Sequence, residues 1–113
     1  MIIIYHNPRC KKSRETLEIL QSKKAHYKVF KYLEEPLKAE ELGKIIKILN
    51  IKPIELVRKN EAIWKDNFKN LEFTDEELVE IMAKYPKLIE RPIVINGDKA
   101  VIGRPPNRIL DIL

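Results

Sequence analysis

The only cysteine of the chain, Cys10, lies among positively charged residues in a stretch that also contains a histidine. It follows an apolar run, Met1 to Tyr5, and precedes residues with helical apolar spacing. We therefore expect it in a loop between a strand and a helix. Amide N–H groups at a helix start have no intrahelical acceptor, so they favour a thiolate and any oxyanion that approaches it. This stretch is a candidate nucleophile and anion site.

A cysteine with an unperturbed pKa is only about 3% thiolate at pH 7, and lowering that pKa by about two units makes it mostly thiolate. The helix N-terminus can supply part of the shift, and the surrounding cations can supply the rest: His6, Arg9, Lys11, Lys12 and Arg14. The alternative is an inert buried cysteine beside ordinary solvated charges. A core cysteine is not expected between Arg9 and Lys11, so the reactive interpretation is favoured.

At 113 residues the chain is long enough for one core, and we expect a single domain over residues 1–113. Its net charge of +5 suits nucleic acid, an anionic membrane or small anions as partners. The lysines are spread among glutamates, however, and no zinc-finger, helix-turn-helix or RNA-binding aromatic signature accompanies them. Nucleic acid is therefore not the expected partner.

One cysteine cannot form an internal disulfide, and neither His6 nor His26 has metal-ligand spacing with it. Neither a disulfide framework nor a metal site is expected. The apolar opening is too short for a signal peptide, and no segment approaches membrane-spanning length. We expect a cytoplasmic protein that keeps its thiol reduced and has no membrane partner.

Apolar periodicity predicts a strand over Met1 to Tyr5, a helix from Ser13 to about Lys24, and a second strand over Tyr27 to Leu33. These elements form a βαβ unit with parallel strands. Residues from about 36 to 85 then read as an inserted helical segment. Its helices are expected over about 38–49, from Pro53, as short turns over 61–71 with Trp64 and Phe68 packed inward, and from the capping box at Thr74 to about Lys84.

The last part of the chain predicts a hairpin, with strands over 93–95 and 100–102 and a turn at Asn96-Gly97. A final helix over 107–113 would direct Ile109, Leu110 and Leu113 to the core. The sum is an α/β chain with a mixed four-stranded sheet: βαβ, an inserted helical segment, then ββα. This order resembles a thioredoxin-like or glutaredoxin-like sheet. In that fold a reactive cysteine starts the first helix, and a proline just before the third strand, here Pro92, faces it.

Four motifs carry a more specific resemblance. The chain is similar to the glutaredoxin-coupled arsenate reductase family over essentially its whole length. The matching motifs are His6-Asn7-Pro8 with Cys10 and Ser13-Arg14, Leu56-Val57-Arg58-Lys59-Asn60, Glu90-Arg91-Pro92-Ile93-Val94, and Gly103-Arg104-Pro105.

The resemblance implies that Cys10 attacks arsenic, that Pro92 follows a cis peptide bond, and that three arginines line an oxyanion pocket: Arg58, Arg91 and Arg104. Guanidinium forks suit this task, because they bind a tetrahedral oxyanion with two hydrogen bonds that an ammonium cannot match. Three further residues are expected to support the thiolate: His6, Ser13 and Arg14. The Ser13 hydroxyl can donate to the sulfur, and His6 either adds charge when protonated or only holds the loop.

The activity that the resemblance implies is reduction of arsenate to arsenite, as in arsenic detoxification, with glutathione as co-substrate, glutaredoxin as a further electron donor and no bound cofactor. Ser13 stands where a Cys-x-x-Cys switch would have its second thiol, so an intramolecular redox switch is excluded. Two alternatives stay open. One is a glutathione-dependent thiol reductase with another substrate, and the other is a non-catalytic regulator that binds RNA polymerase.

Overall fold

The computed structural model describes all residues from Met1 to Leu113, which divide into two compact units. A sheet unit combines residues 1–35 with residues 91–113, and a helical unit spans residues 36–90. That the whole chain acts as one domain stays a prediction. None of the helices has both the length and the apolar composition of a membrane-spanning segment.

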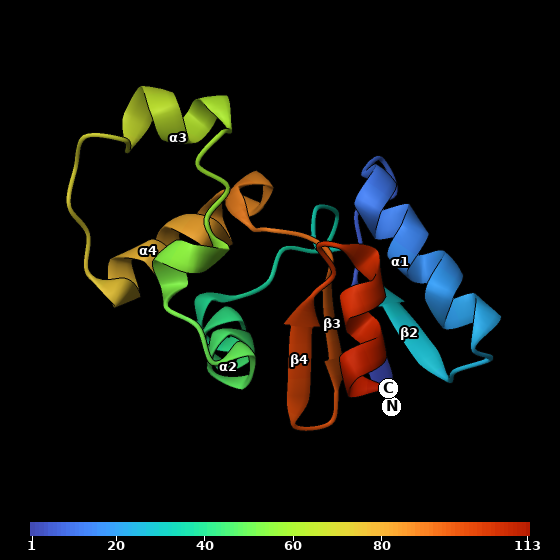
Figure 1. Cartoon of the computed structure of the whole chain (residues 1–113). Coiled ribbons are helices and arrows are strands. Elements are labelled where there is room, and N and C mark those ends of the chain that lie inside the picture. The colour runs from blue at the N-terminus through green and yellow to red at the C-terminus, as the bar shows by residue number, and fades with distance from the viewer. The chain divides into compact units, whose positions relative to one another are not determined.

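The sheet unit contains four short strands (Figure 1). Their order across the sheet is β2-β1-β3-β4, with β1 parallel to β2 and all other pairings antiparallel. The predicted α/β class and mixed four-stranded sheet are confirmed. The elements of this unit are β1 (Ile2–Tyr5), α1 (Lys11–Ser22), β2 (Tyr27–Phe30), β3 (Ile93–Asn96), β4 (Lys99–Ile102) and the 3₁₀ helix η3 (Pro106–Ile112).

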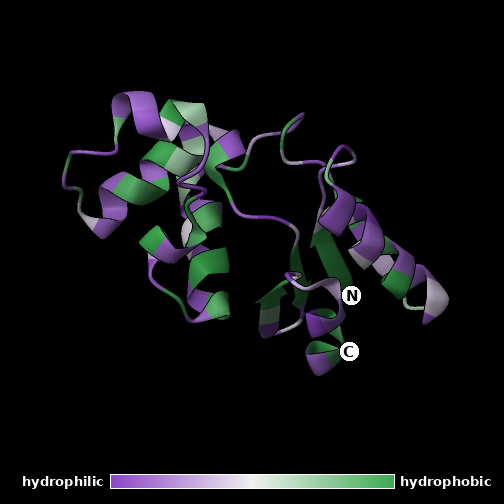
Figure 2. Ribbon diagram, turned by 45° about the horizontal axis from the view of Figure 1, so that its top comes forward, coloured by the Kyte–Doolittle hydropathy of each residue, from purple (hydrophilic) through white to green (hydrophobic).

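One face of this sheet packs against α1 and η3. Ile4 is fully buried and pairs across the sheet with Val94, and both contribute to a core that the two helices complete. Alternate strand residues point to one face, which is why the apolar runs can build this layer. Figure 2 shows mostly hydrophobic strands beside a largely hydrophilic α1. The core cluster consists of Ile2, Ile4, Leu20, Val94, Ile109 and Ile112.

Strand β2 is shorter than predicted, ending at Phe30 instead of Leu33. Its parallel partner β1 ends at Tyr5, which is paired with Phe30, so later residues have no strand to bond. The chain turns there instead, and the carbonyl of Lys31 accepts from the amides of Glu34 and Glu35. The alternating residue pattern extends to Leu33, but a strand needs a hydrogen-bonded neighbour, and β1 provides one only as far as Phe30.

The hairpin forms with a turn one residue later than predicted. Asn96 pairs with Lys99, so the turn residues are Gly97 and Asp98. Gly97 alone in this turn has a positive φ, 65°, which is the pattern of a type II′ turn. The Asn96 side chain donates instead to the carbonyl oxygen of Ile112 at 2.6 Å and ties the hairpin to η3.

The final helix has 3₁₀ rather than α geometry, and this changes which side chains reach the core. With three residues per turn, Pro106, Ile109 and Ile112 share one face and are buried. Ile109 is in the core as predicted. Leu110 and Leu113, expected there too, are 46% and 45% exposed. The α-helical period assumed for this segment was wrong.

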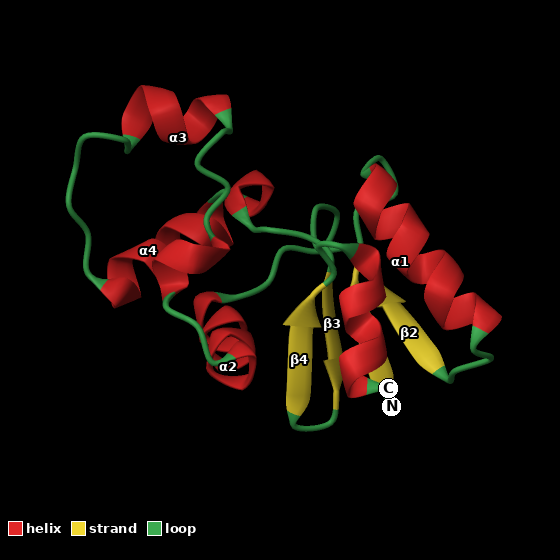
Figure 3. Cartoon of the chain, viewed as in Figure 1, coloured by secondary structure: helices red, strands yellow, loops and turns green.

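The helical unit contains helices and loops, with one isolated bridge between Val57 and Ile89 (Figure 3). The predicted capping box is present: Thr74 Oγ1 accepts from the Glu77 amide at 3.2 Å, and a Glu77 carboxylate oxygen accepts from the Thr74 amide at 2.9 Å. Trp64 is buried and packs on Phe68, as expected. The elements are α2 (Ala39–Leu49), η1 (Pro53–Leu56), α3 (Ala62–Asn67), α4 (Asp75–Lys84) and η2 (Pro86–Leu88).

The close packing at Gly103 predicts a stability difference between two glycine variants. A Cβ at Gly103 would lie 2.8 Å from Thr16 Oγ1 and 2.9 Å from Pro92 Cγ, whereas one at Gly43 in α2 would meet nothing within 4 Å. We expect Gly103→Ala to lower the free energy of unfolding by about 1 to 3 kcal/mol through overpacking. Gly43→Ala should raise it by up to about 1 kcal/mol, because alanine favours the helix. Urea unfolding measures both, and equal effects would contradict the packing argument.

Candidate active site

Cys10 lies in the loop between β1 and α1, as predicted, and is the N-cap residue of α1. Its backbone is extended, with φ −94° and ψ 122°, and its side chain is almost buried, with the residue 7% exposed. Asn7 holds the loop, since its carbonyl accepts from the Cys10 amide and its Oδ1 from the Arg9 amide, both at 3.0 Å. Sequence analysis gave Asn7 no role of its own, although such side chain to backbone bonds are typical of asparagine in turns.

Ser13 and His6 stabilise the same loop from inside. The Ser13 hydroxyl is fully buried, lies 2.6 Å from His6 Nδ1 and accepts from the Asn7 amide at 3.0 Å. Burial lowers the pKa of His6, and the charges of Lys31 and Arg14 lower it further, so the imidazole is neutral at neutral pH. Of the two roles left open for His6, the structure favours holding the loop over adding charge.

The exposed cations around Cys10 do not lower the thiol pKa as the sequence predicted. Arg14 Nη1 donates to the Pro8 carbonyl at 3.0 Å, so it braces the loop rather than the sulfur. Lys11 lies 4.0 Å from Glu15, with 79% of its side chain exposed, a pairing worth little in water. Arg9, Lys11, Lys12 and Arg14 are all exposed, and none of their side chains is among the groups that shift the thiol pKa.

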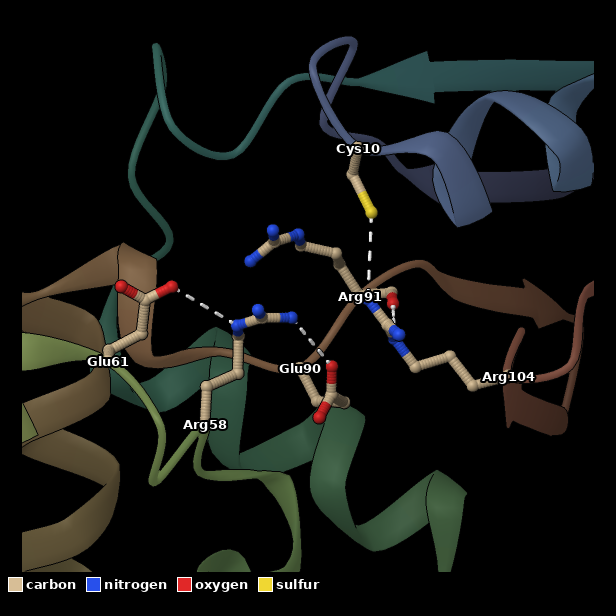
Figure 4. A network of polar contacts seen from close by, with 6 residues as sticks. All are labelled: Cys10, Arg58, Glu61, Glu90, Arg91 and Arg104. Carbon is tan, nitrogen blue, oxygen red and sulfur yellow. Dashed lines mark hydrogen bonds and ion pairs between the residues drawn. The ribbon is translucent and has the colours of Figure 1, made fainter.

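Two arginines beside neighbouring strands act on the sulfur, and Figure 4 shows the contact that Arg104 makes with it. Arg104 Nη2 lies 3.6 Å from Cys10 Sγ, and its Nε donates to the Arg91 carbonyl at 2.8 Å. The Arg91 guanidinium lowers the pKa of the Cys10 thiol through hydrogen bonding and charge. The two residues come together because Arg91 precedes β3 and Arg104 follows β4, and the Gly103 amide donates to the Pro92 carbonyl at 2.8 Å. The bond between Arg91 and Pro92 is cis, as expected, and so is that between Arg104 and Pro105.

The pKa of the Cys10 thiol results from opposing effects. Burial raises it, because a thiolate loses solvation. The Ser13 amide, the hydrogen bond and charge of Arg91, and the Lys12 amide lower it, and their sum leaves the pKa below that of an ordinary cysteine. Neither amide forms a full capping hydrogen bond with the side chain. Ser13 therefore acts on the sulfur through its backbone N–H, and not through the hydroxyl as expected.

Arg58 belongs to the helical unit, where carboxylates hold its guanidinium. Glu90 Oε1 lies 3.0 Å from Nη1, and Glu61 Oε1 lies 3.4 Å from Nε. Sequence analysis missed both partners. Glu61 is three residues from Arg58 and could have been found from that spacing, but no local signal links Arg58 to Glu90, 32 residues away. Its assignment as an oxyanion ligand stays a prediction. No three His, Cys, Asp or Glu side chains lie close enough together to hold a metal ion.

The pKa of Cys10 can be tested by titrating the ultraviolet absorbance of the thiolate. We expect the wild-type midpoint to lie below the ordinary cysteine value, and the midpoint of Arg91→Gln to lie above that of the wild type. Sulfate bound to the wild type should also raise its midpoint, because added negative charge disfavours the thiolate. Arg9→Gln is a matched control, since it removes an exposed cation one residue from the thiol. Equal shifts in the two variants would mean that diffuse loop charge, and not the Arg91 contact, sets the pKa.

The neutral state of His6 predicts a pH dependence of stability. As pH falls below the ordinary histidine pKa of 6.5, the unfolded chain protonates His6 while the folded protein, with its lowered pKa, does not. The free energy of unfolding should therefore fall with pH in this range until His6 of the folded protein also protonates. Urea unfolding should show a weaker fall in His6→Gln, whereas His26→Gln, at an exposed position, should keep the wild-type fall.

Comparison with known proteins identifies the family. The model of the ArsC family matches residues 5–112. The chain is 45% identical to an arsenate reductase of Haemophilus influenzae, covering 99% of this chain and 98% of that protein, and 45% identical to the uncharacterised Escherichia coli protein YfgD, covering 97% and 94%. A solved arsenate reductase from Vibrio cholerae superposes with a TM-score of 0.94 at 41% identity, over 99% of this chain and 97% of that one. The chain, with its thioredoxin-like fold, therefore belongs to the ArsC family.

Proposed function

We propose that the chain is an arsenate reductase in which the Cys10 thiolate is the nucleophile. The observation that carries this proposal is the pair of guanidinium groups, of Arg91 and Arg104, at a sulfur with a lowered pKa. Relatives of similar length at 45% and 41% identity are named arsenate reductases, which supports the same substrate class. A thiol with a lowered pKa beside forked cations suits a tetrahedral oxyanion.

The chemistry begins with attack of the Cys10 sulfur on arsenic. One arsenate oxygen leaves as water after taking up two protons, and a sulfur–arsenic bond replaces it. Arg91 and Arg104 hold the remaining oxygens and offset their charge as the bond forms. Arg58 is assigned a similar role by the family resemblance. The Ser13 and Lys12 amides favour the thiolate form of the sulfur, because they lower the thiol pKa.

The two electrons that convert arsenate to arsenite must come from outside the chain. Cys10 is its only cysteine, so no second thiol can release the adduct as an internal disulfide. Two external thiols are needed, and their oxidation to one disulfide balances the reduction of one arsenate to one arsenite and one water. We assign these thiols to glutathione and then glutaredoxin, in the cytoplasm, with no bound cofactor.

The test is arsenate-dependent oxidation of NADPH through glutathione reductase, glutathione and glutaredoxin. We expect activity in the wild type that depends on both thiols and is lost in Cys10→Ser. Arg91→Lys and Arg104→Lys keep the charge but lose the fork, which is worth about 1.5 to 3 kcal/mol. Each should lower kcat/KM roughly ten- to hundredfold.

The matched control is Arg108→Lys, an exposed position in η3, which should keep wild-type turnover. Alkylation of Cys10 by iodoacetamide, a neutral reagent, should change far less than arsenate turnover in the Arg91 and Arg104 variants. Equal losses in both assays would favour a general thiol reductase with another substrate. Wild-type protein without arsenate-dependent activity would overturn the proposal.

A further inference from the structure

The guanidinium of Arg58 is already occupied by carboxylates of the chain itself. Glu90 accepts from Nη1 at 3.0 Å, and Glu61 faces Nε at 3.4 Å (Figure 4). The side chains of Arg58, Glu61 and Glu90 are 20%, 30% and 26% exposed, so water screens these contacts less than it screens surface pairs. One positive charge thus faces two negative ones.

The positions of these carboxylates matter for binding an oxyanion. A guanidinium has two edges along which a pair of N–H groups can grip an anion bidentately, one with Nε and Nη2 and the other with Nη1 and Nη2. Glu61 faces Nε, which belongs to the first edge, and Glu90 accepts from Nη1, which belongs to the second. A carboxylate thus already contacts one nitrogen of each edge, and an oxyanion that grips either edge must compete with it.

Glu90 is the stronger competitor of the two. Its contact with Arg58 is shorter, and the backbone fixes both residues: the Arg58 amide donates to the Leu88 carbonyl at 2.7 Å and the Glu90 amide to the Leu56 carbonyl at 2.8 Å. The pair therefore does not depend on flexible segments that happen to meet. Glu61, at the N-cap of α3, makes the longer contact and is the more readily displaced.

We propose that Glu90 lowers the oxyanion affinity of the chain by competing with oxyanions for Arg58, so that Arg58 contributes fully to anion binding only when this carboxylate is displaced. This inference deepens the proposed function and rests on it, since Arg58 is there an oxyanion ligand. The consequence is an oxyanion affinity that Glu90 keeps low. Removing its charge should raise that affinity through Arg58 alone.

A double-mutant cycle tests the competition directly. The probe is inorganic sulfate, an unreactive tetrahedral oxyanion, titrated calorimetrically at constant ionic strength into wild type, Arg58→Gln, Glu90→Gln and the double variant. We expect about tenfold tighter binding for Glu90→Gln than for the wild type, and no such gain when Glu90→Gln is added to Arg58→Gln. Glu72→Gln, at an exposed position, controls for net charge and should bind as the wild type does.

Two results would overturn the inference. If Glu90→Gln tightens binding equally with and without Arg58, Glu90 acts through net charge and not through Arg58. If Glu90→Gln weakens binding, Glu90 orients Arg58 instead of competing for the anion. Should Glu90→Gln not fold, Glu90→Asp keeps the charge but withdraws it by one methylene, and tighter sulfate binding is again expected, with no gain counting against the inference.

Arsenate turnover of the same four proteins separates this inference from the proposed function. No turnover in any of them, with the expected sulfate cycle, would remove the reductase activity and leave the competition intact. Turnover that depends on Cys10, without coupling between Arg58 and Glu90 in sulfate binding, would remove only the competition.

Discussion

A thiolate that is almost withdrawn from water must regain its stabilisation from the protein, and this constraint governs the sheet unit around Cys10. Burial alone would raise the thiol pKa and favour the protonated, less nucleophilic form. The compensation comes from amide dipoles at the start of α1 and from the guanidinium of Arg91. Neither depends on the side-chain charges of the exposed lysines, which water solvates and screens. The loop therefore directs amide N–H groups toward the sulfur, and its buried polar side chains hold the loop in that conformation.

The hairpin of β3 and β4 meets the same constraint from the other side. Its two strands bring the segment before β3 and the segment after β4 to one edge of the sheet, so Arg91 and Arg104 converge although 13 positions separate them. The backbone bond between Gly103 and Pro92 closes this edge. The approach of Gly103 to Thr16 leaves no room for a side chain there. Sheet register and a missing Cβ thus hold two cations beside one sulfur.

The surroundings of Arg58 differ from those of the other two arginines. Arg91 and Arg104 lie at a sulfur whose thiolate form positive charge stabilises, whereas Arg58 faces two carboxylates in the helical unit. A charged side chain that is mostly buried needs partners, and Glu61 and Glu90 supply them. In our proposal, the partners that stabilise Arg58 are also those with which an oxyanion must compete. The three arginines of the resemblance are thus not equivalent in their surroundings.

The sequence alone was sufficient to predict features that depend on residues close together in the chain. The cysteine between cations, the capping box at Thr74 and the β-branched strands each depend on residues a few positions apart, and the sheet class followed from their order. Residues that only folding brings together decided the rest. The end of β2 was set by where β1 ends, the partner of Arg58 lay 32 residues away, and the thiol pKa depended on amide directions and on Arg91. Charge near in sequence did not act on the sulfur, because electrostatic effects depend on distance and solvent exposure in the folded protein, which residue types do not specify.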